Sequence, residues 1–148
     1  MTPYTHERTT HRISSADAHT CAFSLALEHT PTSPARARRE AQSVLSSWGV
    51  SEERIYDALV VISELVTNSI THAAPPVTLH LQYSSESPEL VQVHVRDGGP
   101  TQPALDPTSP IDGEHGRGEM IIRSLAYDQG TSTAVSGLID YWAELPCW

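Results

Sequence analysis

ISELVTNSITHA (residues 62–73) is the most informative segment of the chain, because it sets Glu64 and Asn68 among apolar residues. Residues four positions apart project from the same face of a helix. On spacing alone, ordinary surface residues of an amphipathic helix are the simplest interpretation. A carboxylate next to an amide oxygen is also a suitable hard-oxygen pair for Mg²⁺. The rest of the chain has to distinguish these two interpretations.

The helix that carries this pair is expected to begin at Ser51 and to run to about Ala73, before the proline pair at 75–76. Glutamates at its start suit the positive end of the helix dipole. Its predicted buried stripe consists of Ile55, Leu59, Ile62, Val66 and Ile70.

Upstream, the alternating apolar residues of 21–29 predict a first strand. A helix should follow, with Ser33 as its cap, Pro34 at its first position and Gly49 after its last residue, Trp48.

Downstream, 77–83 and 90–96 alternate with a period of two and predict an antiparallel hairpin. The stretch 97–118 is rich in glycine and proline, and a loop of this length is usually a functional lid or disordered. A short helix from Glu119 ending at Gly130 is expected next.

A last hairpin is expected from 131–135 and 138–145, turning at Ser136-Gly137. The strands come in adjacent pairs and do not alternate strictly with helices. We therefore predict an α+β fold: a two-layer sandwich with a mainly antiparallel sheet and helices on one face.

Composition limits the possible functions. The chain has 148 residues and a net charge of −9, and all nine basic residues are arginine. Such an acidic chain lacks the electrostatic footprint of general nucleic-acid binding. No apolar run is long enough to span a membrane, and no signal peptide is evident. Residues 1–20 are polar and are expected to be a disordered leader, with one domain over 21–148.

The two cysteines, Cys21 and Cys147, form no CxxC pair and are expected to be free thiols.

Two further segments carry candidate chemistry. In VRDGGP (95–100), Asp97 ends a strand and two glycines follow, so a flat ligand could approach the backbone closely. An ionised Asp97 could accept a hydrogen bond from an exocyclic amine, although a simple Asp-Gly turn explains the pattern equally well. In GEHGRGEM (113–120), glycines lead into a helix, which is a weak signal for an anion site that includes Arg117.

Together, the three segments resemble the ATP-binding domain shared by histidine kinases, GyrB, Hsp90 and MutL. The resemblance is closest to the anti-sigma-factor serine kinases of the RsbW and SpoIIAB type found in actinobacteria. ISELVTNSITHA is similar to their N box, VHVRDGGP to their G1 box and GRGEMIIRSLAYDQG to their G2 box. The resemblance as a whole extends from about residue 30 to residue 145.

The resemblance implies a role for each matching residue. Asn68 would coordinate Mg²⁺ that bridges the ATP phosphates, and Glu64 would be the catalytic base acting on a serine of a partner protein. Asp97 would bind the adenine amino group, with Gly99 beside the ring. The residues that would wrap the phosphates, under a lid formed by 100–115, are Gly116, Arg117 and Gly118.

The family also implies an anti-sigma factor in the cytoplasm, acting as a homodimer. Its partners would be an anti-anti-sigma protein of the STAS type and a sigma factor or similar target, with no direct contact to nucleic acid or membrane.

Three positions depart from the family pattern. Thr101 replaces a glycine of the G1 box, Glu119 follows Gly118 where leucine is usual, and Leu138-Ile139 replaces a Lys-Thr pair. A catalytically weakened or inactive module that acts by protein binding alone is therefore the second hypothesis. A third, a metal-dependent hydrolase using Glu64, His72 and His115, has no motif with ligand spacing.

Overall fold

The structure is a computed structural model that describes residues 13–15, 18–86, 89–101, 113–134 and 136–147. Its elements along the chain are β1 (Ile13–Ser15), β2 (Ala18–Leu27), α1 (Ser33–Ser47), α2 (Glu52–His72), β3 (Val77–Ser84), β4 (Leu90–Asp97), α3 (Gly113–Leu125), β5 (Asp128–Thr133) and β6 (Ile139–Pro146).

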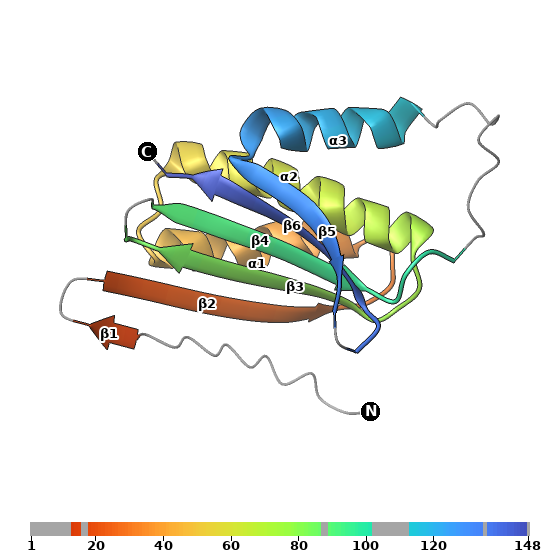
Figure 1. Cartoon of the computed structure of the whole chain (residues 1–148), viewed down its shortest axis with the longest axis horizontal. Helices are drawn as coiled ribbons and strands as arrows, with labels where there is room; N and C mark the ends of the chain where they lie inside the picture. Colours follow the sequence, from red (N-terminus) through yellow and green to blue (C-terminus); the bar gives the residue numbers. More distant parts are fainter. Residues whose placement is uncertain (1–12, 16–17, 87–88, 102–112, 135, 148) are drawn as a thin grey trace.

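The strands form one six-stranded sheet in the order β1-β2-β3-β4-β6-β5, and every neighbouring pair is antiparallel. Figure 1 shows α1 and α2 on one side of this sheet, with α3 alongside α2. The predicted α+β sandwich with an antiparallel sheet is confirmed. The predicted hairpin of β3 and β4 is confirmed as well, with Leu81 opposite Val93.

Local sequence signals explain where the two long helices begin. The Ser51 side chain accepts a hydrogen bond from the backbone N–H of Arg54, which caps α2 as expected. The expectation for α1 is wrong in detail, because Ser33 is the first helical residue and its hydroxyl donates to the Glu28 carbonyl. The hydroxyl is buried there, so a bond to the preceding loop satisfies it.

The core lies between the sheet and α1 and α2. Alternate residues of β3 and β4 are buried against the helices, as their period of two predicts. On α2 the buried stripe is centred differently from the prediction, since Leu59 and Ile70 are only half-buried. The fully or nearly fully buried positions of α2 are Ile55, Ala58, Val61, Ile62, Leu65, Val66 and Ser69. Packing of α3 against α2 accounts for this shift, because it covers a second side of the helix.

The opposite face of the sheet carries polar side chains that bond to one another. Ser24 and His80 share a hydrogen bond of 2.8 Å, and His94 Nδ1 lies 3.0 Å from Asp140 Oδ2. Burial lowers the pKa of His80, and the positive charge of Arg96 lowers it further. The neutral form of His80 is therefore favoured.

Two boundaries differ from the sequence-based expectation. The predicted leader does not extend to residue 20, because 13–15 and 18–20 belong to strands; residues 1–12 lie outside the described part. Thr20 pairs with Ser84 in the same ladder that holds the apolar part of β2. Backbone pairing in β2 thus extends toward the N-terminus beyond the alternating apolar residues, into positions where the side chains give no strand signal.

The helix predicted to end at Gly130 ends at Leu125, and Asp128–Thr133 forms β5 instead. The backbone N–H of Tyr127 donates to the Glu144 carbonyl of β6, so sheet pairing replaces helical bonding directly after the helix. The last hairpin and its turn are confirmed, with Gly137 at φ +85°.

Gly130 provides a test of the β5–β6 pairing. It lies opposite Trp142, and a Cβ added at Gly130 would be 2.6 Å from the indole ring. Gly130→Ala is expected to lower the free energy of unfolding by about 1–2 kcal/mol through overpacking. The measurement is urea denaturation of the variant, alone and in a Trp142→Ala background. In that background the loss should disappear; a loss that persists would show that the indole is not its cause.

Cys21 and Cys147 are both free thiols, as predicted, and both are half-buried. Within the described residues, no helix combines the length and the apolar content needed to cross a membrane.

Candidate functional site

The end of α2 is joined to the loop that follows β4 by a short backbone ladder. The N–H of Gly98 donates to the Ala74 carbonyl at 2.7 Å, and the N–H of Ala74 donates to the Gly99 carbonyl at 2.8 Å. One step further, both the N–H and the hydroxyl of Thr101 donate to the His72 carbonyl, at 3.0 and 3.1 Å. The segments that resemble the N box and the G1 box are therefore held side by side.

This contact explains two residues of the loop. Gly98 has no room for a side chain, because an added Cβ would lie 2.5 Å from the Pro75 carbonyl oxygen and 2.8 Å from that of Ala74. Thr101 departs from the family's glycine, and its hydroxyl adds a bond to the last turn of α2 that glycine could not make. His29 also bonds to this end of α2, through the Ala73 carbonyl at 2.7 Å.

Asp97, the last residue of β4, is buried with 1% of its surface exposed. Its Oδ1 accepts the N–H of Gly99 at 2.8 Å, and its Oδ2 accepts the hydroxyl of Ser69 at 2.6 Å. A carboxylate held by two donors has a fixed orientation and offers its remaining lone pairs only to further donors. The sequence-based expectation for Asp97, an acceptor for an amino group, fits this geometry.

Gly99 lies beside Asp97 with a φ of +88°, a conformation that favours glycine. The nearest atom to an added Cβ there would be a side-chain carbon of Ile139, at 3.7 Å. Ile139 thus places an apolar side chain next to Gly99, the glycine that was expected to lie beside the adenine ring.

Glu64 and Asn68 are both half-buried, on the side of α2 that faces α3. A Cβ added at Gly118 of α3 would lie 2.6 Å from Glu64 Oε2, so the two helices approach closely at this carboxylate. Neither Glu64 nor Asn68 forms a hydrogen bond or ion pair with the rest of the described chain. Within the described residues, therefore, no hydrogen-bond partner holds either side chain.

The glycine-rich segment 113–118 was expected to be a loop that leads into a helix, but it is already helical. α3 begins at Gly113, so Gly116–Gly118 lie within its first two turns. Pairing of Arg123 with Glu119 at 3.1 Å and burial of Ile122 stabilise the turns that follow. The backbone N–H groups without a helical acceptor are then those of 113–116, which leaves Gly118 outside the expected donor set.

Two residues near Asp97 were missed from the sequence. Ser69 lies on the buried stripe, three residues after Val66, and a serine on an apolar stripe is a signal for a buried hydrogen bond. Tyr141 of β6 is half-buried; burial raises the pKa of its phenol, and the negative charge of Asp97 raises it further. Tyr141 pairs with Val95 of β4, two residues before Asp97.

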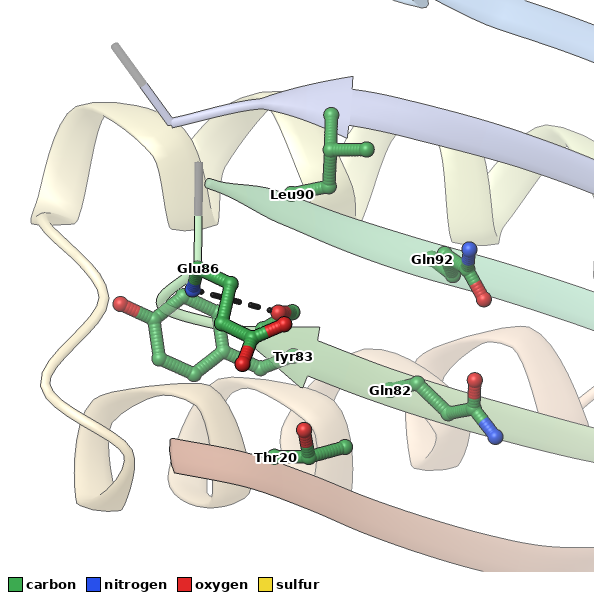
Figure 2. A pocket seen from close by; sticks show the side chains of 7 residues that line it. Thr20, Gln82, Tyr83, Glu86, Leu90 and Gln92 are labelled. Atoms are coloured by element: carbon green, nitrogen blue, oxygen red, sulfur yellow. Dashed lines mark hydrogen bonds between the residues drawn. The ribbon is translucent and has the colours of Figure 1, made fainter. Parts of the chain in front are cut away.

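A hollow of about 260 Å³ lies elsewhere, on the open face of the sheet near the β3–β4 turn (Figure 2). Its lining includes Gln82 of β3, Gln92 of β4 and Thr20 of β2. Asp97 is at the other end of β4, about 20 Å away at the rise of a β-strand. This hollow is therefore separate from the candidate site.

The side-chain oxygens of Glu64 and Asn68 suit a Mg²⁺ ion whose other ligands are phosphate and water. Among the described residues, no three His, Cys, Asp or Glu side chains are grouped so that they could hold a metal ion. The hydrolase hypothesis gains no support from these residues, and the side chain of His115 lies outside them. Asn68 and Glu64 offer one amide and one carboxylate oxygen, and Mg²⁺ typically takes one or two protein ligands beside phosphates.

The sheet order, the helix positions and the joined ends of α2 and β4 define the α+β sandwich of the GHKL class of ATPase domains. Residues 27–135 match the family described as the histidine kinase-like ATPase domain. This match covers more than half of the chain, and the chain belongs to that family. No protein among the curated sequences matches it significantly.

Among solved structures, the chain is similar to the crystal structure of the RsbU and RsbW domains of Rv1364c from Mycobacterium tuberculosis. The TM-score is 0.64 at 16% sequence identity, and the alignment covers 86% of this chain. The chain spans 32% of that longer protein. At this identity the likeness concerns the fold alone.

Proposed function

We propose that the chain is an ATP-binding regulatory protein kinase of the anti-sigma type, which transfers a phosphoryl group to a serine of an anti-anti-sigma protein. The observation that carries the proposal is the geometry at the joined ends of α2 and β4. There the buried Asp97 carboxylate is held as an acceptor by Ser69 of α2, and α2 also carries Glu64 and Asn68, which form no hydrogen bond with the other described residues. Family membership supports ATP as the ligand.

The proposed chemistry assigns one task to each residue. Asp97 accepts a hydrogen bond from the adenine amine, and Gly99 lies beside the adenine ring. Glu64 takes the proton of the partner's serine hydroxyl while the serine oxygen attacks the γ-phosphorus of ATP. The bond between the γ-phosphorus and the β–γ bridging oxygen breaks, and ADP leaves. Mg²⁺, when bound, neutralises phosphate charge, and Asn68 supplies a protein ligand for it.

A second candidate is a module of the same fold that regulates by protein binding alone. Two observations favour it: Ile139 lies beside Gly99, and Glu64 packs against the backbone of Gly118. Isothermal titration with ATP and Mg²⁺ separates the two candidates. Binding in the micromolar range would support the kinase, whereas no heat of binding at millimolar nucleotide would leave only the second candidate.

Asn68→Ala tests the metal role. Loss of the amide oxygen should weaken ATP binding in the presence of Mg²⁺ by about 10-fold or more, since a hydrogen-bond or ligand contact to a charged group contributes about 1.5–3 kcal/mol. Binding measured in EDTA should change less than about twofold. Thr67→Ala, an exposed neighbour on α2, is the matched control. Equal weakening with and without Mg²⁺ would contradict the assigned role.

We further propose a cytoplasmic homodimer whose partners are a STAS-type protein and a sigma factor or similar target. The resemblance to RsbW-type proteins supports this proposal. Pull-down with the full chain, followed by transfer of labelled phosphate from ATP to the recovered proteins, would identify the phosphorylated serine. Labelling of no recovered protein by an ATP-binding chain would oppose the kinase function.

A further inference from the structure

The bond between Ser69 and Asp97 links two segments that are 28 residues apart in sequence. Ser69 follows Asn68 on α2 and is 1% exposed, and its hydroxyl donates to Asp97 Oδ2 at 2.6 Å. A serine within a helix can bond to a carbonyl of its own helix one turn back. Here the hydroxyl reaches across to the end of β4 instead.

The other oxygen of Asp97 is held locally. Oδ1 accepts the N–H of Gly99, two residues on, which is a common turn interaction of aspartate. That bond alone ties the carboxylate to its own loop. The Ser69 bond ties it to the helix that carries Glu64 and Asn68, so the orientation of the carboxylate depends on α2.

We propose that Ser69 is a positioning residue for base recognition: its hydroxyl orients the Asp97 carboxylate so that this group selects a purine with an exocyclic amine. The inference deepens the proposed function and rests on it. Because the hydroxyl hydrogen is committed to Asp97, the carboxylate is held as a pure acceptor toward a ligand. A purine without the amine offers no donor to it, and a 6-oxo purine offers an acceptor that it repels.

The residue of β6 beside this turn offers no donor to the carboxylate. Ile139 is apolar, and its side-chain carbon would lie 3.7 Å from a Cβ added at Gly99. Among the described residues, the side chain that donates to the Asp97 carboxylate is Ser69. A hydroxyl from α2 is thus placed to orient the carboxylate where β6 supplies an apolar group.

A buried serine that only satisfies its own hydroxyl would stabilise the fold without affecting base selection. The two roles are separated by measuring the affinities of ATP and purine riboside 5′-triphosphate, which lacks the 6-amino group. The wild-type chain should prefer ATP by about 10- to 100-fold, the range expected for one hydrogen bond to a charged group. Ser69→Ala should reduce this preference by at least about fivefold, mostly by weakening ATP, with the analogue within about twofold.

Two further variants complete the test. Ser69→Cys replaces the hydroxyl with a slightly larger thiol, which is a weaker donor, so its ATP preference should be intermediate. This variant also carries the test if the alanine variant does not fold. Thr67→Ala loses an exposed hydroxyl on the same helix and should keep the wild-type preference.

The inference is overturned if folded Ser69 variants keep the wild-type ratio of affinities, or if both nucleotides weaken equally. Failure of the wild-type chain to bind either nucleotide at millimolar concentration would overturn the proposed function as well. If the wild-type chain binds ATP and the variants keep its preference for ATP over the analogue, only the role of Ser69 is refuted.

Discussion

Gly98→Ala is expected to destabilise the protein by at least about 3 kcal/mol, beyond the usual cost of overpacking. The added Cβ would lie 2.5 Å from the carbonyl oxygen of Pro75 and 2.8 Å from that of Ala74. Both are backbone atoms, so no side-chain rotation can relieve the contact. Separating the segment after α2 from the loop after β4 would also break the bonds of the Gly98 N–H and the Ala74 N–H.

The control for this prediction is Gly49→Ala. Gly49 has a φ of +82° and no atom within 4 Å of an added Cβ, so it isolates backbone strain from steric overlap. Its expected cost is about 1–2 kcal/mol. Both variants are measured by urea denaturation followed by tryptophan fluorescence. Similar losses for the two variants would mean that the close approach at Gly98 relaxes easily.

Glu64→Gln is expected to lower phosphotransfer by about 10²- to 10⁴-fold, the usual contribution of a catalytic base. The amide keeps the size of the side chain and cannot accept the serine proton. ATP affinity should stay within about threefold, because removing one base leaves the other proposed nucleotide contacts in place. The measurement is transfer of labelled phosphate to the partner protein, beside a titration with ATP and Mg²⁺.

Glu53→Gln is the matched control, since Glu53 is exposed in the first turn of the same helix. It should transfer phosphate at the wild-type rate. Undiminished transfer by Glu64→Gln would exclude Glu64 as the base, and a parallel loss of ATP affinity would make it a binding residue. A wild-type chain that binds ATP without any transfer would favour the non-catalytic module.

Much of the fold could be predicted because its signals are local. The period of two in β3 and β4 and the capped start of α2 follow from residues close in sequence. The predictions failed where pairing overrode local preference. Residues 18–20 and 128–130 show no alternating apolar pattern, and they are strands because neighbouring strands bond to their backbone. Such bonds leave no trace in side-chain periodicity.

The candidate site divides in the same way. By itself, the sequence determined that Glu64 and Asn68 share a helix face and that Asp97 ends a strand before two glycines. Only the tertiary structure decided that these segments meet, that Ser69 holds Asp97, and that Gly118 lies against Glu64. The physical reason is that helical and strand spacing is a property of neighbouring residues, whereas a contact across 28 residues depends on how α2 packs on the sheet.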